Sequence, residues 1–197
     1  MDQKTFIFIG RSGCGKGTQA DLLIKHLNET HPERKVVYLQ TGREFREFIQ
    51  RNKYTSKLSK EIYDAGDRQP DFLAVNMWSH FFIKNITGEE DLVIDGTPRS
   101  LNEAEILDTA INWMYKIKNP MVIHINVSSD WSRNRLMNRG RMDDTKEDIE
   151  SRLEWFDKDV MPAIDYYKKN NYYKFIEVDG ERDIESVHRD ITTLIEK

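Results

Sequence analysis

The stretch "TFIFIGRSGCGKGTQ" covers residues 5–19 and joins an apolar run to a glycine-rich loop. The run "TFIFI" is typical of a buried strand, and the residues after the loop carry Ala20, Leu23 and Leu27 on one helical stripe. A strand, a tight loop and a helix in this order let backbone N–H groups and a helix N-terminus converge on an anion. The stretch therefore predicts an α/β fold that opens with a phosphate-binding loop.

The glycine-rich loop matches the pattern G-x-x-x-x-G-K-[ST], except that Gly17 lies between Lys16 and Thr18. Glycines allow N–H groups to turn inward around phosphate oxygens, and Lys16 adds a positive charge. The pattern favours nucleotide binding over a glycine-rich turn that holds no phosphate, but it indicates no particular reaction. Cys14 is either a reactive thiol beside the phosphates or a small side chain at a variable position.

The composition excludes several classes of protein. Hydrophobic residues make up 38% of the 197 residues and charged residues 32%, which is typical of a globular domain rather than a disordered chain. No apolar run approaches the roughly 20 residues of a membrane span, and the first ten residues lack the pattern of a signal peptide. The single cysteine rules out an intrachain disulfide and a cysteine zinc cluster, so we expect a cytoplasmic protein. The net charge of −4 argues against a nucleic-acid surface, and no membrane partner is expected.

Apolar, β-rich runs alternate along the chain with helical patterns, which predicts a mostly parallel sheet covered by helices. The expected strands are residues 5–9, 35–39, 91–95, 121–127 and 173–178. Residues 41–87 carry helical patterns without a strand and are expected to form a helical insert. A further apolar stripe runs from Ile149 to Ile164, and Pro162 is expected to kink or split that helix.

The segment "DLVIDGTPRS" (91–100) places Asp95 at the end of an expected strand, with Arg99 four residues later. Ligands of open parallel sheets bind beyond the carboxyl ends of the strands. Asp95 can hold Mg²⁺ there through water, and Arg99 can donate to a phosphate in a forked geometry. The alternatives are a loop cap for Asp95 and an ordinary surface residue for Arg99, but the pair together favours a functional site.

An arginine-rich segment runs from Arg133 to Arg152. A DNA-binding patch is one interpretation, but acidic residues between 143 and 148 interrupt its basic surface. A solvated helix face is the second. The third is an arginine clamp on a phosphoryl group in transfer, because that reaction needs positioning and charge stabilisation more than a nucleophilic side chain.

These segments together resemble the adenylate kinase family of nucleoside monophosphate kinases, over essentially the whole chain. "GRSGCGKGTQ" (10–19) is similar to the family's G-x-P-G-x-G-K-G-T-Q, and "DGTPRSLNEA" (95–104) is similar to D-G-F-P-R-T-x-x-Q-A. Further matches are "TGREFR" (41–46) with T-G-D-L-L-R, "AGDRQPD" (65–71) with G-x-x-V-P-D, and "GRMDD" (140–144) with G-R-x-D-D. The segments "ESRLEWF" and "MPAIDYY" resemble the family's helix with R-L and P-V-I-x-Y-Y.

The resemblance implies a P-loop kinase-like three-layer fold with a central parallel five-stranded sheet flanked by helices. It implies a single domain with a core at 1–40, 88–138 and 145–197, a monophosphate-binding insert at 41–87 and a very short lid at 139–144. The implied reaction is the reversible transfer of the γ-phosphoryl group of ATP to AMP, which gives two ADP and uses Mg²⁺. A monomer is expected.

The resemblance also implies a role for individual residues. ATP is expected to contact Gly13, Cys14, Gly15, Lys16, Gly17, Thr18, Arg135, Arg139 and the backbone near Arg182. AMP is expected to contact Thr41, Gly42, Arg46, Gln69 through its backbone, Gly96, Arg99, Glu103, Arg141 and Arg152. The catalytic cations are expected to be Lys16, Arg99, Arg135, Arg139, Arg141 and Arg152. Asp95, through water, and Thr18 are expected to position Mg²⁺.

The chain departs from the family pattern at several positions. Ser12 replaces the loop proline, and Thr97 replaces a phenylalanine. Glu103 stands where the family has a glutamine that contacts adenine, and an ionised carboxylate accepts hydrogen bonds only, from adenine or from cytosine. Thr41 favours AMP, because relatives that act on UMP and CMP tend to have alanine there.

Only Gly140 separates Arg139 from Arg141 in the expected lid. A lid this short is expected to exclude water poorly, and so to allow more ATP hydrolysis than in a relative with a longer lid. Two other functions remain as alternatives. One is a pyrimidine or broad-specificity monophosphate kinase, and the other is a nucleotide-dependent switch that hydrolyses ATP slowly.

Overall fold

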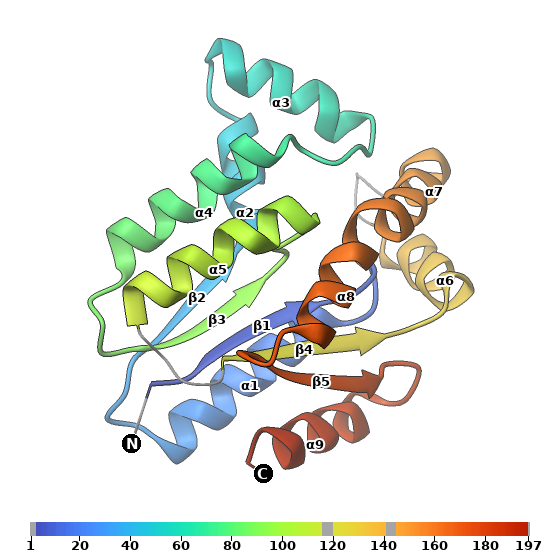
Figure 1. The fold of residues 1–197 in the computed structure, drawn as a ribbon. Helices are drawn as coiled ribbons and strands as arrows, with labels where there is room; N and C mark the ends of the chain where they lie inside the picture. Colours follow the sequence, from blue (N-terminus) through green and yellow to red (C-terminus); the bar gives the residue numbers. More distant parts are fainter. Residues whose placement is uncertain (1–2, 116–119, 141–144, 197) are drawn as a thin grey trace.

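A computed structural model describes residues 3–115, 120–140 and 145–196. Its centre is a sheet of five strands in the order β2-β3-β1-β4-β5, in which every neighbouring pair is parallel (Figure 1). The strands are β1 (Thr5–Ile9), β2 (Val36–Gln40), β3 (Asp91–Asp95), β4 (Met121–Asn126) and β5 (Lys174–Asp179). Each expected strand is confirmed, and its bounds differ by no more than one residue.

Helices cover both faces of the sheet and complete a three-layer α/β fold (Figure 1). Successive β1 residues alternate between the two layers, since side chains of a strand point to opposite faces. Phe6 and Phe8 pack in the cluster that contains residues of α1 (Lys16–Thr30) and α9 (Ile184–Ile195). Ile7 and Ile9 belong to the other cluster, with residues of α5 (Leu101–Tyr115) and α8 (Met161–Lys169). The expected fold class is confirmed.

Residues 41–87 form three helices with no strand, as expected. They are α2 (Thr41–Ile49), α3 (Tyr54–Asp64) and α4 (Asp71–Asn85), and α3 lies farthest from the sheet (Figure 1). Phe45, Phe48 and Leu73 pack between α2 and α4. Trp78 and Phe82 of α4 are buried in the main core, so the last helix of the insert is also a covering helix of the sheet.

The stripe from Ile149 to Ile164 is divided as Pro162 predicts. It contains α7 (Lys146–Trp155), a single π-helical segment η1 (Phe156–Val160) and the start of α8. Pro162 lies in the first turn of α8, directly after the π-helical segment. The π-helical segment absorbs the change of register between the two helices.

Helix α6 (Ser129–Arg139) ends at Gly140, which has the left-handed conformation common after a helix. Arg141 to Asp144 lie outside the described residues, so the expectation about lid closure and ATP hydrolysis stays a prediction. Among the helices that the structure describes, none is long and apolar enough to cross a membrane.

Candidate functional site

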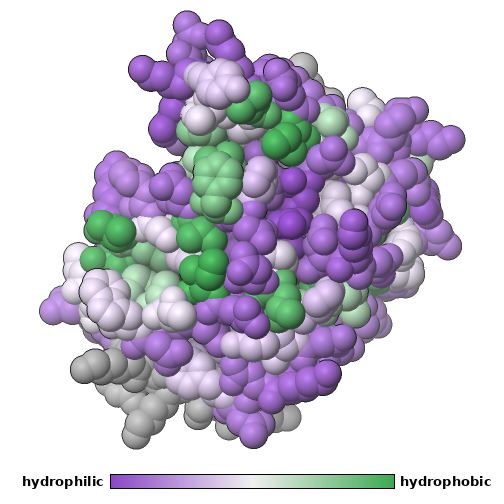
Figure 2. Space-filling view, turned by 45° about the horizontal axis from the view of Figure 1, so that its top comes forward, coloured by the Kyte–Doolittle hydropathy of each residue, from purple (hydrophilic) through white to green (hydrophobic). Residues whose placement is uncertain are grey.

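Two loops meet at the carboxyl edge of the sheet because their strands are parallel neighbours. β1 leads into the glycine-rich loop and β3 leads into residues 96–100, and the two strands pair directly. Both loops contribute to one cavity of about 620 Å³, and Lys16 and Arg99 are both among its lining residues. This face of the molecule is largely hydrophilic, with apolar side chains in separate patches (Figure 2). A cavity here is where open parallel sheets bind ligands.

The glycine-rich loop ends where α1 begins at Lys16, which places the helix N-terminus at the cavity. Gly13 has a left-handed φ of +83°, and a Cβ there would lie 3.1 Å from Leu136 and 3.2 Å from the carbonyl oxygen of Ser132. Both constraints require glycine. The Nζ of Lys16 donates hydrogen bonds to the carbonyl oxygens of Gly10, at 2.6 Å, and Arg11, at 2.8 Å. The ammonium group of Lys16 is therefore held by carbonyl oxygens of the loop itself.

The loop after β3 holds Asp95 and Arg99 close together. The Nε of Arg99 donates to the carbonyl oxygen of Gly96 at 2.7 Å, and this hydrogen bond anchors the guanidinium group at its Nε atom. Burial lowers the pKa of Arg99, while the carboxylates of Glu103 and Asp95 oppose that shift. Burial also raises the pKa of Asp95, and the charges of Lys16 and Arg99 oppose that shift. The two loops are thus electrostatically coupled through Asp95.

The charge of the cavity is opposite to that of the whole chain. Its basic lining residues are Lys16, Arg43, Arg46, Arg99, Arg135, Arg139 and Arg152. Its acidic lining residues are Asp67 and Asp95. The sequence carries a net charge of −4, so the positive charge concentrated here is a property of the site. Such a cavity attracts polyanions and stabilises negative charge that develops within it.

Most of the residues expected from the sequence line this cavity. They are Gly13, Gly15, Lys16, Gly17, Thr18, Gly42, Arg46, Gln69, Asp95, Gly96, Arg99, Arg135, Arg139 and Arg152. Cys14, Thr41, Glu103 and Arg182 are not among its lining residues. Arg141 lies outside the described residues.

The four expected residues outside the lining have different surroundings. Cys14 is buried beneath the loop, 3.6 Å from the Nζ of Lys16. Thr41 is buried at the start of α2, and its hydroxyl has no hydrogen-bond partner among the described residues. The side chain of Arg182 is on the surface and forms an ion pair with Asp190. The guanidinium group of Arg182 is therefore engaged by a surface carboxylate.

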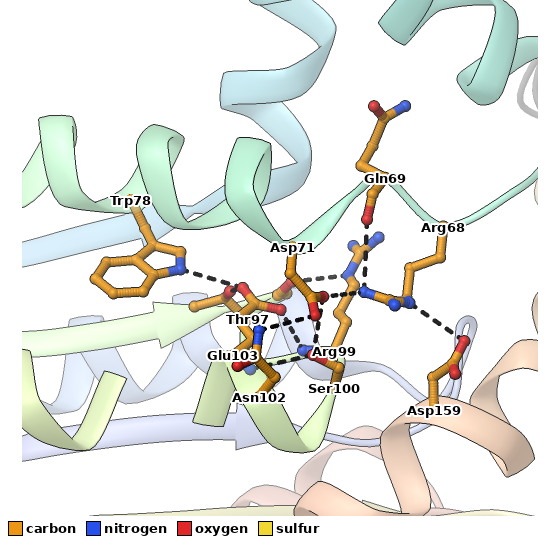
Figure 3. Close-up of polar contacts among 11 residues, drawn as sticks. Arg68, Gln69, Asp71, Trp78, Thr97, Arg99, Ser100, Asn102, Glu103 and Asp159 are labelled. Carbon is orange, nitrogen blue, oxygen red and sulfur yellow. Dashed lines mark hydrogen bonds and ion pairs between the residues drawn. The ribbon is translucent and has the colours of Figure 1, made fainter. Parts of the chain in front are cut away.

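The structure places the carboxylate of Glu103 inside the protein rather than in the cavity (Figure 3). It accepts hydrogen bonds from the indole N–H of Trp78, the hydroxyl of Thr97 and the backbone N–H of Arg99. These contacts direct both carboxylate oxygens to protein donors. The expected contact of Glu103 with the acceptor base stays a prediction, since the side chain forms internal hydrogen bonds in this structure.

Sequence analysis missed Trp155 and Tyr63, which also line the cavity. The Nε1 of Trp155 donates to the carbonyl oxygen of Gly66 at 3.2 Å, and the guanidinium carbon of Arg99 lies 5.7 Å from the centre of its ring. Trp155 is three residues after Arg152 and so lies on the same side of α7. That spacing was the signal available for it, whereas nothing near Tyr63 in the sequence indicates its position.

The acidic residues of the cavity are compatible with a metal cation that binds together with a nucleotide. Among the described residues there is no group of three or more His, Cys, Asp or Glu side chains that could hold a metal ion by themselves. Mg²⁺ needs only one or two carboxylates, because water and phosphate oxygens supply its other ligands. Asp95 lines the cavity beside Gly17 and Thr18, and its Oδ2 lies 3.6 Å from where a Cβ of Gly17 would be. Asp95 and Thr18 therefore fit a magnesium–nucleotide complex.

Comparison with known proteins shows that the chain is similar to adenylate kinases over most of its length. A family model described as adenylate kinase matches residues 8–172. The adenylate kinase of Prochlorococcus marinus strain MIT 9301 is 30% identical over 191 residues, which are 96% of this chain and 97% of that protein. The adenylate kinase of Leuconostoc mesenteroides subsp. mesenteroides is 31% identical over 193 residues, 98% of this chain and 97% of that protein. The adenylate kinase of P. marinus strain NATL2A is 33% identical over 187 residues, 94% of each chain.

Proposed function

The chain belongs to the adenylate kinase family, and we propose that it transfers the γ-phosphoryl group of ATP to AMP in the cavity between its two phosphate-binding loops. The reaction is reversible and gives two ADP. The observation that supports this proposal most strongly is the shared cavity, in which Lys16 after β1 and Arg99 after β3 face the same space. One nucleotide needs only one of these cations, whereas two phosphate chains that meet need both.

ATP occupies the side of the cavity formed by the glycine-rich loop. Backbone N–H groups from Gly13 to Thr18, Cys14 included, surround its β- and γ-phosphates together with the N-terminus of α1. Arg135 and Arg139 approach from α6, and both line the cavity. The backbone near Arg182 borders the adenine, and the surface position of the Arg182 guanidinium is compatible with a backbone contact.

AMP occupies the side formed by the insert and the loop after β3. Its phosphate is held by Arg46, Arg99 and Arg152, with Thr41, Gly42 and Gly96 close to it. The buried hydroxyl of Thr41, without a partner among the described residues, suits a phosphate or ribose oxygen. The side chain of Gln69 exchanges two hydrogen bonds with Ser59, at 2.9 and 2.8 Å, which favours its backbone over its side chain as the contact with the nucleotide, although its carbonyl oxygen also accepts from Arg68 at 3.5 Å.

The chemistry needs positioning and charge stabilisation rather than a nucleophilic side chain. A phosphate oxygen of AMP attacks the γ-phosphorus of ATP, and the bond from that phosphorus to the β–γ bridging oxygen breaks. The reacting groups are both anionic, so Lys16, Arg99, Arg135, Arg139, Arg141 and Arg152 offset their repulsion and stabilise the phosphoryl group in transfer. Because a phosphate monoester is largely dianionic at pH 7, no residue has to remove a proton from it.

Asp95, through water, and Thr18 would hold Mg²⁺ with the nucleotide. When bound, this ion supplies charge neutralisation for the β- and γ-phosphates. The negative charge of Asp95 also interacts favourably with the positive charges of Lys16 and Arg99. Since both phosphate-binding elements come from one chain, we further propose a monomer, and the single cysteine supports a cytoplasmic location.

A coupled assay with ATP, Mg²⁺ and each of AMP, CMP, UMP and GMP tests the proposal. We expect ADP to form fastest with AMP. Faster turnover of CMP or UMP would instead assign a pyrimidine monophosphate kinase. ATP hydrolysis that no monophosphate accelerates would assign a nucleotide-dependent switch and contradict the proposal.

A further inference from the structure

Glu103 lies in the first turn of α5 and is only 1% exposed. Its Oε1 accepts hydrogen bonds from the Nε1 of Trp78, at 3.2 Å, and from the hydroxyl of Thr97 (Figure 3). Its Oε2 accepts from the backbone N–H of Arg99 at 2.6 Å. The carboxylate thus joins α4, the loop after β3 and α5 from inside the protein.

The surroundings of Glu103 favour a carboxylate over an amide, although burial raises the pKa of this carboxyl group. Trp78 and the backbone N–H of Arg99 can only donate, and Thr97 donates as well in this structure. A glutamine would offer one accepting oxygen, and its NH₂ group would face a donor. The N-terminal turn of α5 also favours a negative charge. These donors explain why glutamate replaces the family's glutamine here, together with threonine at position 97.

The same loop is tied to α4 at a second point. The Oγ of Ser100 donates to Asp71 at 2.9 Å, and the Nδ2 of Asn102 donates to Asp71 at 3.1 Å. The backbone N–H of Glu103 in turn donates to Ser100 at 3.1 Å. Residues 97–103 are therefore fixed between Trp78 and Asp71, both from the last helix of the insert (Figure 3).

We propose that Glu103 is a positioning residue, which holds the loop of Arg99 in place for the acceptor phosphate and does not contact the acceptor base. The proposal rests on the proposed function. It follows that Glu103 affects all acceptor nucleotides equally, and that preference among bases is set by other residues of the cavity. Arg99 is the residue through which Glu103 acts, since their direct hydrogen bond is made at the backbone N–H.

The test is Glu103→Gln, which preserves the size of the side chain and removes one accepting oxygen. We expect the KM for AMP and the KM for CMP to rise by the same factor, roughly tenfold for the loss of a hydrogen bond to a charged group. The KM for ATP is expected to stay within about twofold of the native value. Thr97→Val removes one donor of the network and is expected to shift the KM values for AMP and CMP in parallel. Thr97→Ser retains the hydroxyl group, so its KM values for AMP and CMP are expected to equal those of the native protein.

Glu90→Gln is the matched control. Glu90 is also a buried carboxylate surrounded by donors, since it accepts from the backbone N–H of Thr87 at 2.7 Å, the hydroxyl of Thr87 at 2.6 Å and the backbone N–H of Gly88 at 3.2 Å. It does not line the cavity. Its substitution is expected to lower the melting temperature without changing the KM for any acceptor.

Three results would overturn the inference. A change in the ratio of AMP to CMP efficiency of tenfold or more, in Glu103→Gln alone, would assign contact with the base. An equal rise in the KM for ATP, or the same acceptor KM shift in Glu90→Gln, would assign general destabilisation. Absence of turnover with every monophosphate in the native protein would refute the proposed function, and this inference with it, whereas the first two results would leave the proposed function intact.

Discussion

Arg99 is the residue that most clearly distinguishes a two-substrate enzyme from a protein that binds one nucleotide. The Nε of its guanidinium group donates a hydrogen bond to the carbonyl oxygen of Gly96, and the ring of Trp155 lies beside the group. Arg99 and Lys16 line the same cavity. A nucleotide-dependent switch would need Lys16 but would have no use for a second cation at the neighbouring strand end. The function of the site is therefore expected to depend on Arg99 at the transfer step.

Arg99→Ala is expected to reduce phosphoryl transfer by roughly 10²- to 10³-fold, because one donor to the developing charge is lost. Binding of ATP, measured by calorimetry, is expected to stay within about twofold of the native value. Arg133→Ala is the control, since Arg133 pairs with Asp130 and Glu150 and does not line the cavity. Transfer at a near-native rate in Arg99→Ala would contradict the two-substrate account.

The sequence allowed Lys16, Asp95 and Arg99 to be placed in one cavity because each follows the end of a strand, and parallel neighbouring strands end at the same edge. The orientation of Glu103 could not be predicted in this way. It depends on the indole of Trp78, 25 residues away in the chain, and on the hydroxyl of Thr97. Such contacts follow from tertiary packing, which local patterns do not contain.

At the scale of elements, the π-helical segment η1 connects both sides of the proposed site to the core. Asp157 forms an ion pair with Arg11 of the glycine-rich loop at 2.7 Å. Asp159 forms an ion pair with Arg68, in the turn before α4, at 3.2 Å. Pro162 predicted the interruption of the helix, but these two contacts could not be predicted because they join residues far apart in sequence.

Asp159→Asn and Asp157→Asn form a pair of variants within this one segment. Asp159→Asn is expected to raise the KM for AMP about threefold, because it loosens a partly exposed ion pair of the insert, and to leave the KM for ATP unchanged. Asp157→Asn is expected to have the reverse preference, because its partner belongs to the ATP side. Steady-state kinetics with each substrate varied separately gives both values. If both variants raised the KM for the same substrate, Asp157 and Asp159 would not support the ATP side and the AMP side separately.

At the scale of the whole molecule, the strand order of the sheet creates the site. β1 and β3 are neighbours although α1, β2 and the insert separate them in the chain, and this crossover brings their two loops together. Alternation of β-rich runs and helical stripes was sufficient to predict the five strands and their cover of helices, whereas the three-layer fold was implied by the resemblance. The double role of α4 was not predictable, because its periodicity does not show that Trp78 and Phe82 enter the main core. The division into core, insert and lid stays a proposal.

The most direct test of the central claim is calorimetric titration with a bisubstrate ligand, two adenosines joined by five phosphates. If two nucleotides meet within one cavity, the account predicts one molecule bound per chain and loss of binding of both ATP and AMP in its presence. Arg99→Ala is expected to weaken this ligand more than it weakens ATP. Binding of AMP or of ATP alongside the bisubstrate ligand would contradict the account.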